Sequence, residues 1–167
     1  LPFDGQWSVT AERGKGSPMI IDVHSHVWEY PRHFSDDFRD QARRARAGTE
    51  VDLTVRFEEY AAAAPPETRT VVFGGKARLS GLWCEDDYVA EQVARHPDRL
   101  IGFLALDPTQ PRWEDELKRG HQELGLRGIK LMPMYAGFRP DEPLLDPLWS
   151  YATDHRLPVL LHTGTTF

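Results

Sequence analysis

The chain has 167 residues, of which 40% are hydrophobic and 28% charged, the ordinary make-up of a globular domain with a sizeable core. Its formal charge of −6 argues against a nucleic-acid-binding surface. No apolar run approaches the roughly 18 residues of a membrane span, and residues 1–18 lack the apolar centre of a signal peptide. We therefore expect a cytoplasmic protein in which residues 1–18 are an N-terminal arm or a tag remnant and residues 19–167 form the folded part.

Strand-like and helix-like segments alternate in the first half of the folded part. Residues 20–23 predict a strand, and an irregular stretch follows as far as residue 46. Thr54 could cap an amphipathic helix whose apolar face is spaced i, i+3, i+4, i+7 and consists of Phe57, Tyr60, Ala61 and Ala64. Residues 65–66 are prolines that end this helix, and residues 70–73 predict the second strand.

The same alternation continues in the second half. Residues 86–96 predict a helix, and residues 100–106 predict a third strand that is buried on both sides. A helix beginning at Pro111 comes before a fourth strand at residues 128–132. Asp146 followed by Pro147 predicts a helix start with Asp146 as the N-cap, and residues 157–162 predict a fifth strand.

This order of elements indicates the class of fold. Strands that alternate with helices imply βαβ units and a parallel sheet, which is either open and doubly wound or closed into a barrel. No Gly-x-Gly-x-x-Gly pattern follows the first strand, so a dinucleotide-binding fold is not supported. Histidines at strand ends favour the TIM-type (β/α)₈ barrel, whose active sites lie at that rim. The sequence predicts an α/β protein that holds about the first five βα units of such a barrel.

The pattern His24-Ser25-His26 at the end of the first strand predicts a metal site. Alternate side chains of a strand point the same way, so His24 and His26 share a face, with Asp22 behind them. Two such imidazoles can reach one metal ion. Asp22 could orient His24 through a ring N–H, or it could belong to a buried network away from the site.

His162 ends the fifth strand and offers a third imidazole. Three histidines make a zinc ligand set with an open position for water, and the bound water could become a nucleophile at neutral pH. Lys130, a charged residue inside an apolar strand, could hold a substrate anion, carry a carbamate that bridges two metal ions, or be a paired structural lysine. Trp28 and Tyr135 follow rim positions and could line a substrate pocket.

Cys84 is the single cysteine, so no disulfide can form within the chain. Its acidic neighbours Glu85, Asp86 and Asp87 would disfavour a thiolate. We expect Cys84 to be structural.

Three passages give the chain from Met19 to Phe167 a family resemblance: residues 21–26, residues 96–108, and residues 128–131 leading to 157–164. In order and spacing they resemble the amidohydrolase superfamily, in particular the amidohydrolase-related group that includes aminocarboxymuconate-semialdehyde decarboxylase. The resemblance implies a (β/α)₈ barrel with a catalytic divalent metal, most often zinc, with manganese or another ion as an alternative. It carries the metal-ligand role over to His24, His26 and His162.

The resemblance also implies residues that have no match here. Family members use a histidine after the sixth strand and an aspartate after the eighth, and we expect both to lie beyond Phe167. Relatives often have a histidine two residues past the fourth-strand lysine, where this chain has Met132. We therefore expect the front portion of a longer polypeptide, a homo-oligomer, or a partner chain that supplies the rest of the barrel.

The leading expectation is a metal-dependent hydrolase that acts on a small carboxylated substrate through a metal-activated water. A decarboxylase that uses the same metal site is the first alternative. A nuclease or phosphoesterase of the same superfamily is disfavoured by Lys130, which stands where such relatives have a glutamate, and by the negative charge. A catalytically inactive part-barrel that serves as a binding or oligomerisation module is the remaining alternative.

Overall fold

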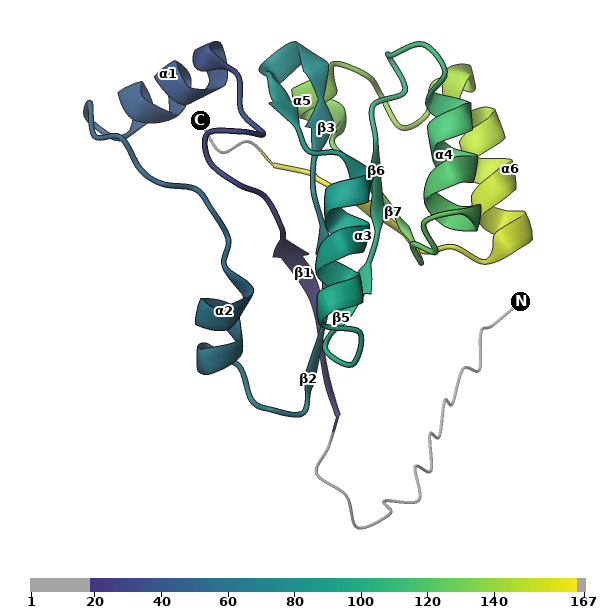
Figure 1. The fold of residues 1–167 in the computed structure, drawn as a ribbon. Coiled ribbons are helices and arrows are strands. Elements are labelled where there is room, and N and C mark those ends of the chain that lie inside the picture. The colour runs from purple at the N-terminus through teal and green to yellow at the C-terminus, as the bar shows by residue number, and fades with distance from the viewer. Residues whose placement is uncertain (1–18, 165–167) are drawn as a thin grey trace, which may run out of the picture.

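A computed structural model describes residues 19–164 of the chain (Figure 1). The predicted N-terminal arm lies outside the described residues. The strands are β1 (Ile20–His26), β2 (Thr68–Phe73), β3 (Lys76–Ala77), β4 (Leu82–Trp83), β5 (Leu100–Gly102), β6 (Leu104–Leu106), β7 (Ile129–Leu131) and β8 (Val159–Leu161). The helices are α1 (Asp36–Ala45), α2 (Phe57–Ala63), η1 (Arg78–Ser80), α3 (Asp86–Arg95), α4 (Trp113–Gln122), α5 (Pro133–Ala136), η2 (Pro143–Leu145) and α6 (Asp146–His155).

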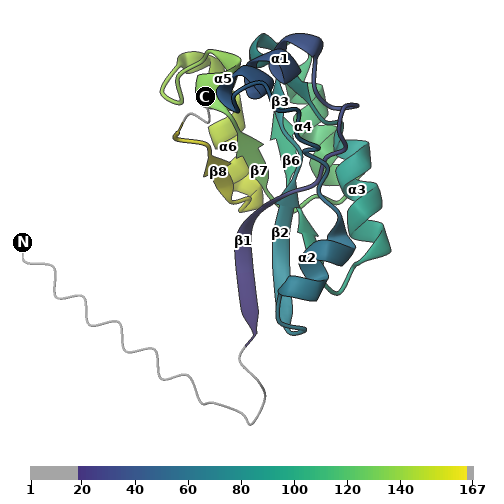
Figure 2. The same ribbon diagram turned by 90° about the vertical axis from the view of Figure 1, so that its left-hand side faces the viewer.

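The main strands are parallel and form two ladders, β1-β2-β5 and β6-β7-β8. A single stretch of chain joins them, because the Phe103 N–H donates to the Val72 carbonyl at 2.9 Å and the Leu104 N–H donates to the Gly128 carbonyl at 2.9 Å. The predicted third strand, residues 100–106, is therefore split at Phe103, where it leaves β2 and joins β7. Residues 19–164 form an open parallel sheet of mixed α/β class and not a closed barrel (Figure 2).

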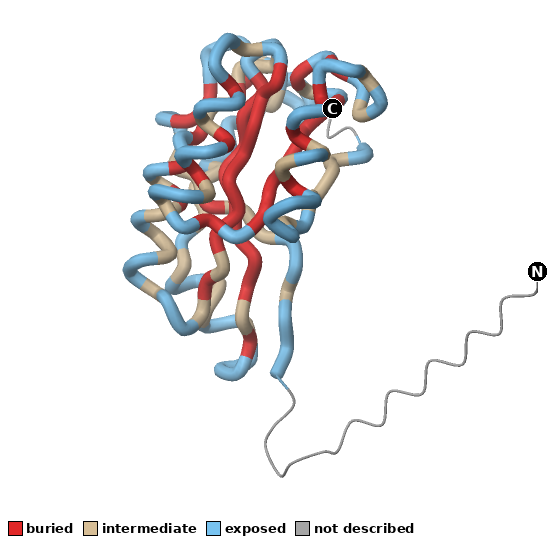
Figure 3. Tube along the Cα trace, turned by 90° about the vertical axis from the view of Figure 1, so that its right-hand side faces the viewer, coloured by how far each residue is buried: buried red, intermediate tan, exposed pale blue. Residues whose placement is uncertain are grey.

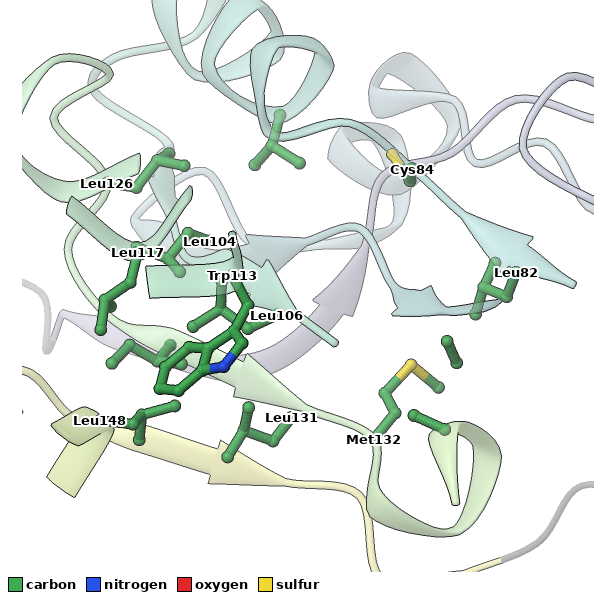
Figure 4. Close-up of a cluster of buried hydrophobic side chains, with 14 of the residues drawn as sticks. Leu82, Cys84, Leu104, Leu106, Trp113, Leu117, Leu126, Leu131, Met132 and Leu148 are labelled. Carbon is green, nitrogen blue, oxygen red and sulfur yellow. The ribbon is translucent and has the colours of Figure 1, made fainter. Parts of the chain in front are cut away.

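Helices α3, α4 and α6 cover one face of this sheet (Figure 1). Leucines that alternate along the strands point toward these helices because side chains of a strand have a period of two. Leu104, Leu106 and Leu131 are fully buried there, close to Trp113 of α4 and Leu148 of α6 (Figure 4). Each such leucine stabilises the fold by roughly 1.5–3 kcal/mol, so this outer layer is the main core.

The opposite face of the sheet carries a smaller cluster. Val71, Phe73 and Phe103 are buried together, with Ile101 and Leu160 packed against them. We call this side of the sheet the inner face. Much of β1 is exposed (Figure 3). Within this strand, Ile21 and Val23 are 48% and 60% exposed.

Helix α1 lies in the stretch predicted to be irregular. Ser35 caps it by accepting a hydrogen bond from the Phe38 N–H at 3.2 Å. Asp36 and Asp37 occupy its first turn and basic residues its last turn, which suits the helix dipole. Phe38 is its single buried residue, so no apolar periodicity marked the helix in the sequence.

Two predicted helix starts are wrong by one or two residues. Helix α2 begins after Arg56, because the Thr54 hydroxyl accepts a hydrogen bond from the Tyr30 N–H at 2.9 Å and does not cap α2. Helix α6 has Leu145 at its N-cap, since the turn η2 runs directly into it, and Asp146 is its first residue. The expected helices themselves are present.

The Cys84 thiol is completely buried and points at the Val27 carbonyl at 3.4 Å. Burial, with a smaller effect from the Asp86 carboxylate, raises its pKa to about 12. Both findings agree with a structural cysteine. None of the helices in residues 19–164 combines the length and apolarity that a bilayer crossing requires.

Candidate metal and substrate site

The three predicted histidines lie at the carboxyl ends of the two outermost strands. His24 and His26 lie near the end of β1, and their ring centroids are 5.4 Å apart. His162 directly follows β8, where its N–H donates to the Leu131 carbonyl at 2.9 Å. A positive charge on His162 would lower the pKa values of His24 and His26, so His162 lies close enough to act on both rings.

Phe73, the last residue of β2, is the floor of this site. Its ring contacts His24 edge-on at a centroid distance of 5.1 Å and His26 at 4.7 Å. Both imidazoles therefore lie on the inner face of the sheet, as their spacing predicted. Phe73 itself was not predicted as a site residue, although its position at a strand end before residues 74–75 was a usable signal.

Asp22 does not lie behind the histidines as predicted. The β1–β2 register has Asp22 opposite Thr70 but Ser25 opposite Val72, so β1 contains one extra residue between Asp22 and Ser25. This bulge puts Asp22 on the outer face, where its carboxylate accepts a hydrogen bond from the Tyr60 hydroxyl at 3.2 Å. Its other oxygen accepts the backbone N–H of His24 at 3.0 Å. The carboxylate thus belongs to a network outside the site.

The histidines are held in their neutral forms. Burial, reinforced by the charge of Lys130, lowers the pKa of His26 to about 3. The pKa values of His24 and His162 are lowered for the same two reasons, in the same order. A neutral imidazole is the form that binds a metal ion, so protonation of these rings would not oppose such a role at neutral pH.

Lys130 projects from β7 onto the same inner face. It is completely buried, and its Nζ lies 4.6 Å from the centroid of the Phe73 ring. Burial lowers its pKa to about 8, and no hydrogen-bond partner for Nζ exists in the described part of the chain. The expectation of a paired structural lysine is therefore not met, whereas a role toward a bound anion agrees with this position.

The described residues meet the requirements of a metal site only in part. In residues 19–164, no three histidine, cysteine, aspartate or glutamate side chains converge closely enough to hold one. Within the same residues, however, buried nitrogens of His26 (Nδ1), His162 (Nε2) and Lys130 (Nζ) have no hydrogen-bond partner. Buried polar atoms without partners are rare in folded proteins. The unpartnered histidine nitrogens thus fit a metal ion, but the full ligand set is not assembled. The assignment of His24, His26 and His162 as metal ligands stays a prediction.

A pocket of about 270 Å³ opens beside His26 and His162. Trp28 stacks on His26 at a centroid distance of 4.0 Å, and Tyr135 meets His162 edge-on at 5.1 Å. Both aromatic residues line the pocket, and their role toward a substrate stays a prediction. The remaining wall is formed by Met132 and by residues that the sequence did not single out for this site: Phe34, Phe38, Ala42, Arg46, Leu53 and Leu82.

Comparison with known proteins identifies a family and similar folds. Residues 21–167 match the protein family described as Amidohydrolase. The fold is similar to that of an uncharacterised TIM-barrel protein from Bordetella bronchiseptica, with a TM-score of 0.64 and 22% identity over 88% of this chain and 56% of the other. No curated protein matches the chain significantly.

Two similar structures are decarboxylases. One is the 5-carboxyvanillate decarboxylase of Novosphingobium aromaticivorans with bound manganese, with a TM-score of 0.64 and 19% identity over 89% of this chain and 52% of that one. The other is a 2,6-dihydroxybenzoate decarboxylase complexed with 2,6-dihydroxybenzoate, with a TM-score of 0.58 and 18% identity over 89% and 51%. The chain thus spans about half the length of these proteins.

Proposed function

Because the chain belongs to the amidohydrolase family, we propose that it supplies the metal-binding and substrate-binding residues of a divalent-metal-dependent enzyme. His24, His26 and His162 would hold the ion, which is zinc or manganese. When bound, such an ion acts as a Lewis acid toward a substrate oxygen. This proposal rests on the pocket of about 270 Å³ whose lining includes His26 and His162.

The reaction that this pocket supports best is the decarboxylation of an aromatic acid. Its walls are mainly aromatic and aliphatic side chains, among them Trp28 and Tyr135. Such walls would contact the faces of an aromatic ring. The two decarboxylases of similar fold act on aromatic acids, which supports the same choice. Hydrolysis, the first expectation from the sequence, is the alternative, and the experiment must distinguish it from decarboxylation.

Lys130 would position the substrate. Its Nζ is buried on the inner face and free of protein partners in the described chain. An ammonium group there would donate a hydrogen bond to an oxygen of the substrate carboxylate and set its orientation over the Phe73 ring. The Trp28 and Tyr135 rings would flank the substrate and exclude water from it.

The metal is tested first, by elemental analysis of the protein after exposure to manganese or zinc and dialysis. We expect about one ion per chain in the wild type, in line with a single three-histidine set. The variants His26→Gln and His162→Gln should lose the ion. His155→Gln is the matched control, because His155 is an exposed residue at the end of α6, and it should keep the ion.

The reaction is tested by incubating the metal-loaded protein with hydroxylated aromatic acids and measuring released carbon dioxide. Release that disappears in His26→Gln and persists in His155→Gln supports decarboxylation. Turnover of an amide or ester without carbon dioxide would instead establish hydrolysis. Metal uptake that is unchanged in both ligand variants would overturn the proposed site.

A further inference from the structure

Helix α1, which supplies part of the pocket wall, makes few buried contacts. Phe38 is its single buried residue, and Phe38 and Ala42 both line the pocket. A helix in a folded protein is held mainly by packing of its apolar face, and α1 has little such face. The position of this wall therefore depends on the contacts at the start of the helix.

The start of α1 rests on Gly81, the residue between η1 and β4. Ser35 is the N-cap of α1, and its N–H donates to the Gly81 carbonyl at 2.8 Å. A Cβ placed on Gly81 would overlap Ser35 Oγ, and it would lie 2.8 Å from Ser35 Cβ and 3.6 Å from Phe38 Cβ. The two segments can therefore meet at this distance only because residue 81 has no side chain.

Gly81 is in turn fixed to the end of the sheet. Its N–H donates to the carbonyl of Arg78, the first residue of η1, at 3.1 Å. The Arg78 N–H donates to Asp107 Oδ2 at 2.8 Å. Asp107 directly follows β6 and is buried, and its other oxygen accepts from the Thr109 N–H at 3.1 Å and the Thr109 hydroxyl at 2.6 Å. A carboxylate that accepts several hydrogen bonds is a firm anchor for η1.

The β3–β4 hairpin that carries Gly81 also reaches the pocket directly. Leu82 pairs with Phe34 in an antiparallel bridge, and both side chains line the pocket. The next residue, Trp83, donates its N–H to the His33 carbonyl at 2.9 Å. Residues 81–83 thus run antiparallel to residues 33–35 and form a three-residue joint between the hairpin and the start of α1.

We propose that Gly81 is a positioning residue for the pocket, because its missing side chain sets how closely α1 lies against the β3–β4 hairpin. The inference rests on the proposed function, in which the pocket holds an aromatic acid. A methyl group at position 81 would displace Ser35, and with it the first turn of α1, and so change the shape of the pocket that Phe38 lines. Gly81 also has φ of 80°, so an alanine there adds backbone strain that has to be separated from this displacement.

The test is isothermal titration of the metal-free protein with benzoate as the probe. Gly81→Ala should raise the dissociation constant of benzoate about tenfold, an effect of overpacking. Ser35→Gly removes both atoms that the new methyl group would meet most closely, and glycine is still accepted at an N-cap. Gly81→Ala/Ser35→Gly should therefore bind benzoate within about threefold of the wild type. Both proteins carry the same left-handed alanine, so this recovery separates displacement of α1 from backbone strain.

Gly125→Ala is the matched control. Gly125 also has a left-handed backbone, with φ of 69°, but a Cβ there would meet no atom within 4 Å. This variant should lose thermal stability through the same strain and keep its affinity for benzoate within about twofold of the wild type. Ser35→Gly alone should also keep that affinity.

Three results would overturn the inference: no measurable benzoate binding by the wild type, unchanged affinity in Gly81→Ala, or no recovery in the double variant. If Gly81→Ala does not fold in a thermal melt, the double variant still decides, because near-wild-type affinity supports the inference and a tenfold loss contradicts it. Neither metal nor catalysis enters this titration. A protein that behaves as expected here but never releases carbon dioxide would contradict the decarboxylase proposal alone.

Discussion

The Nζ atom of Lys130 lies 4.6 Å above the ring of Phe73, completely buried and without an anionic partner in the described chain. Lys76, which is also buried, has the opposite environment. Its Nζ lies 2.8 Å from Asp86 and 2.8 Å from Glu116, and these carboxylates raise its pKa although burial alone would lower it. Lys76 is thus held as a structural cation, whereas Lys130 destabilises the fold unless a ligand compensates for its burial.

We predict that Lys130→Met stabilises the protein and abolishes its activity. Burial lowers the Lys130 pKa from 10.5 to about 8, so below pH 8 the native state carries the full cost of a buried charge. The gain should be about 2 kcal/mol at pH 7. Between pH 8 and 10.5 only the unfolded state binds this proton, so the wild type becomes more stable as pH rises and the gain shrinks. Urea unfolding at pH 7 and at pH 10 measures both values.

Lys76→Met is the control for that experiment. It removes the partner of the buried Asp86 carboxylate and should destabilise the protein by roughly 3 kcal/mol. Loss of stability in Lys130→Met at pH 7 would show that Lys130 has a compensating partner in the folded protein.

Tyr60→Phe should leave metal uptake unchanged. The Tyr60 hydroxyl connects Asp22 of β1 to Thr70 of β2 on the outer face, away from the histidines. Its loss should cost about 1 kcal/mol of unfolding free energy, measured by urea denaturation, with elemental analysis as the second readout. Weaker metal binding in this variant would mean that Asp22 acts on the site after all.

Cys84 should be inert toward thiol reagents in the folded protein. The thiol is fully buried, and its pKa of about 12 leaves almost no thiolate at pH 8. Ellman's reagent should therefore report no accessible thiol in the native protein. In about 6 M guanidinium, which unfolds the chain, it should report one thiol per chain. Rapid reaction under native conditions would indicate that the β3–β4 region opens readily.

Ala47→Gly should stabilise the protein by about 1 kcal/mol. Ala47 has φ of 52°, a left-handed conformation that is costly for any residue with a Cβ and nearly free for glycine. Ala62→Gly is a matched control inside helix α2 and should have the opposite effect of similar size. Thermal melting and urea unfolding give both values, and equal signs for the two substitutions would contradict this reasoning.

The order of the main parallel strands and of helices α2, α3, α4 and α6 was predictable, because it depends on local periodicity and on turn residues. The shared face of His24 and His26 followed from the alternation of strand side chains, whereas no face was predicted for Lys130. Helix α1 was not predicted, because it buries Phe38 alone and so shows no apolar periodicity. The pocket that it lines is formed only when the chain is folded. Asp22 was misplaced because an extra residue in a strand leaves no mark in the spacing of apolar residues.

The bulge in β1 has a consequence for how such chains are compared with one another. Because of the one extra residue, the imidazoles of His24 and His26 lie on the inner face and the carboxylate of Asp22 lies on the outer face. In a regular strand, residues at these even intervals would all share one face. A relative with the same residues at these positions but no bulge in the strand would present a different set of side chains to a bound cation. Aligned residues at this strand therefore share a chemical role only when their hydrogen-bonded ladders also agree.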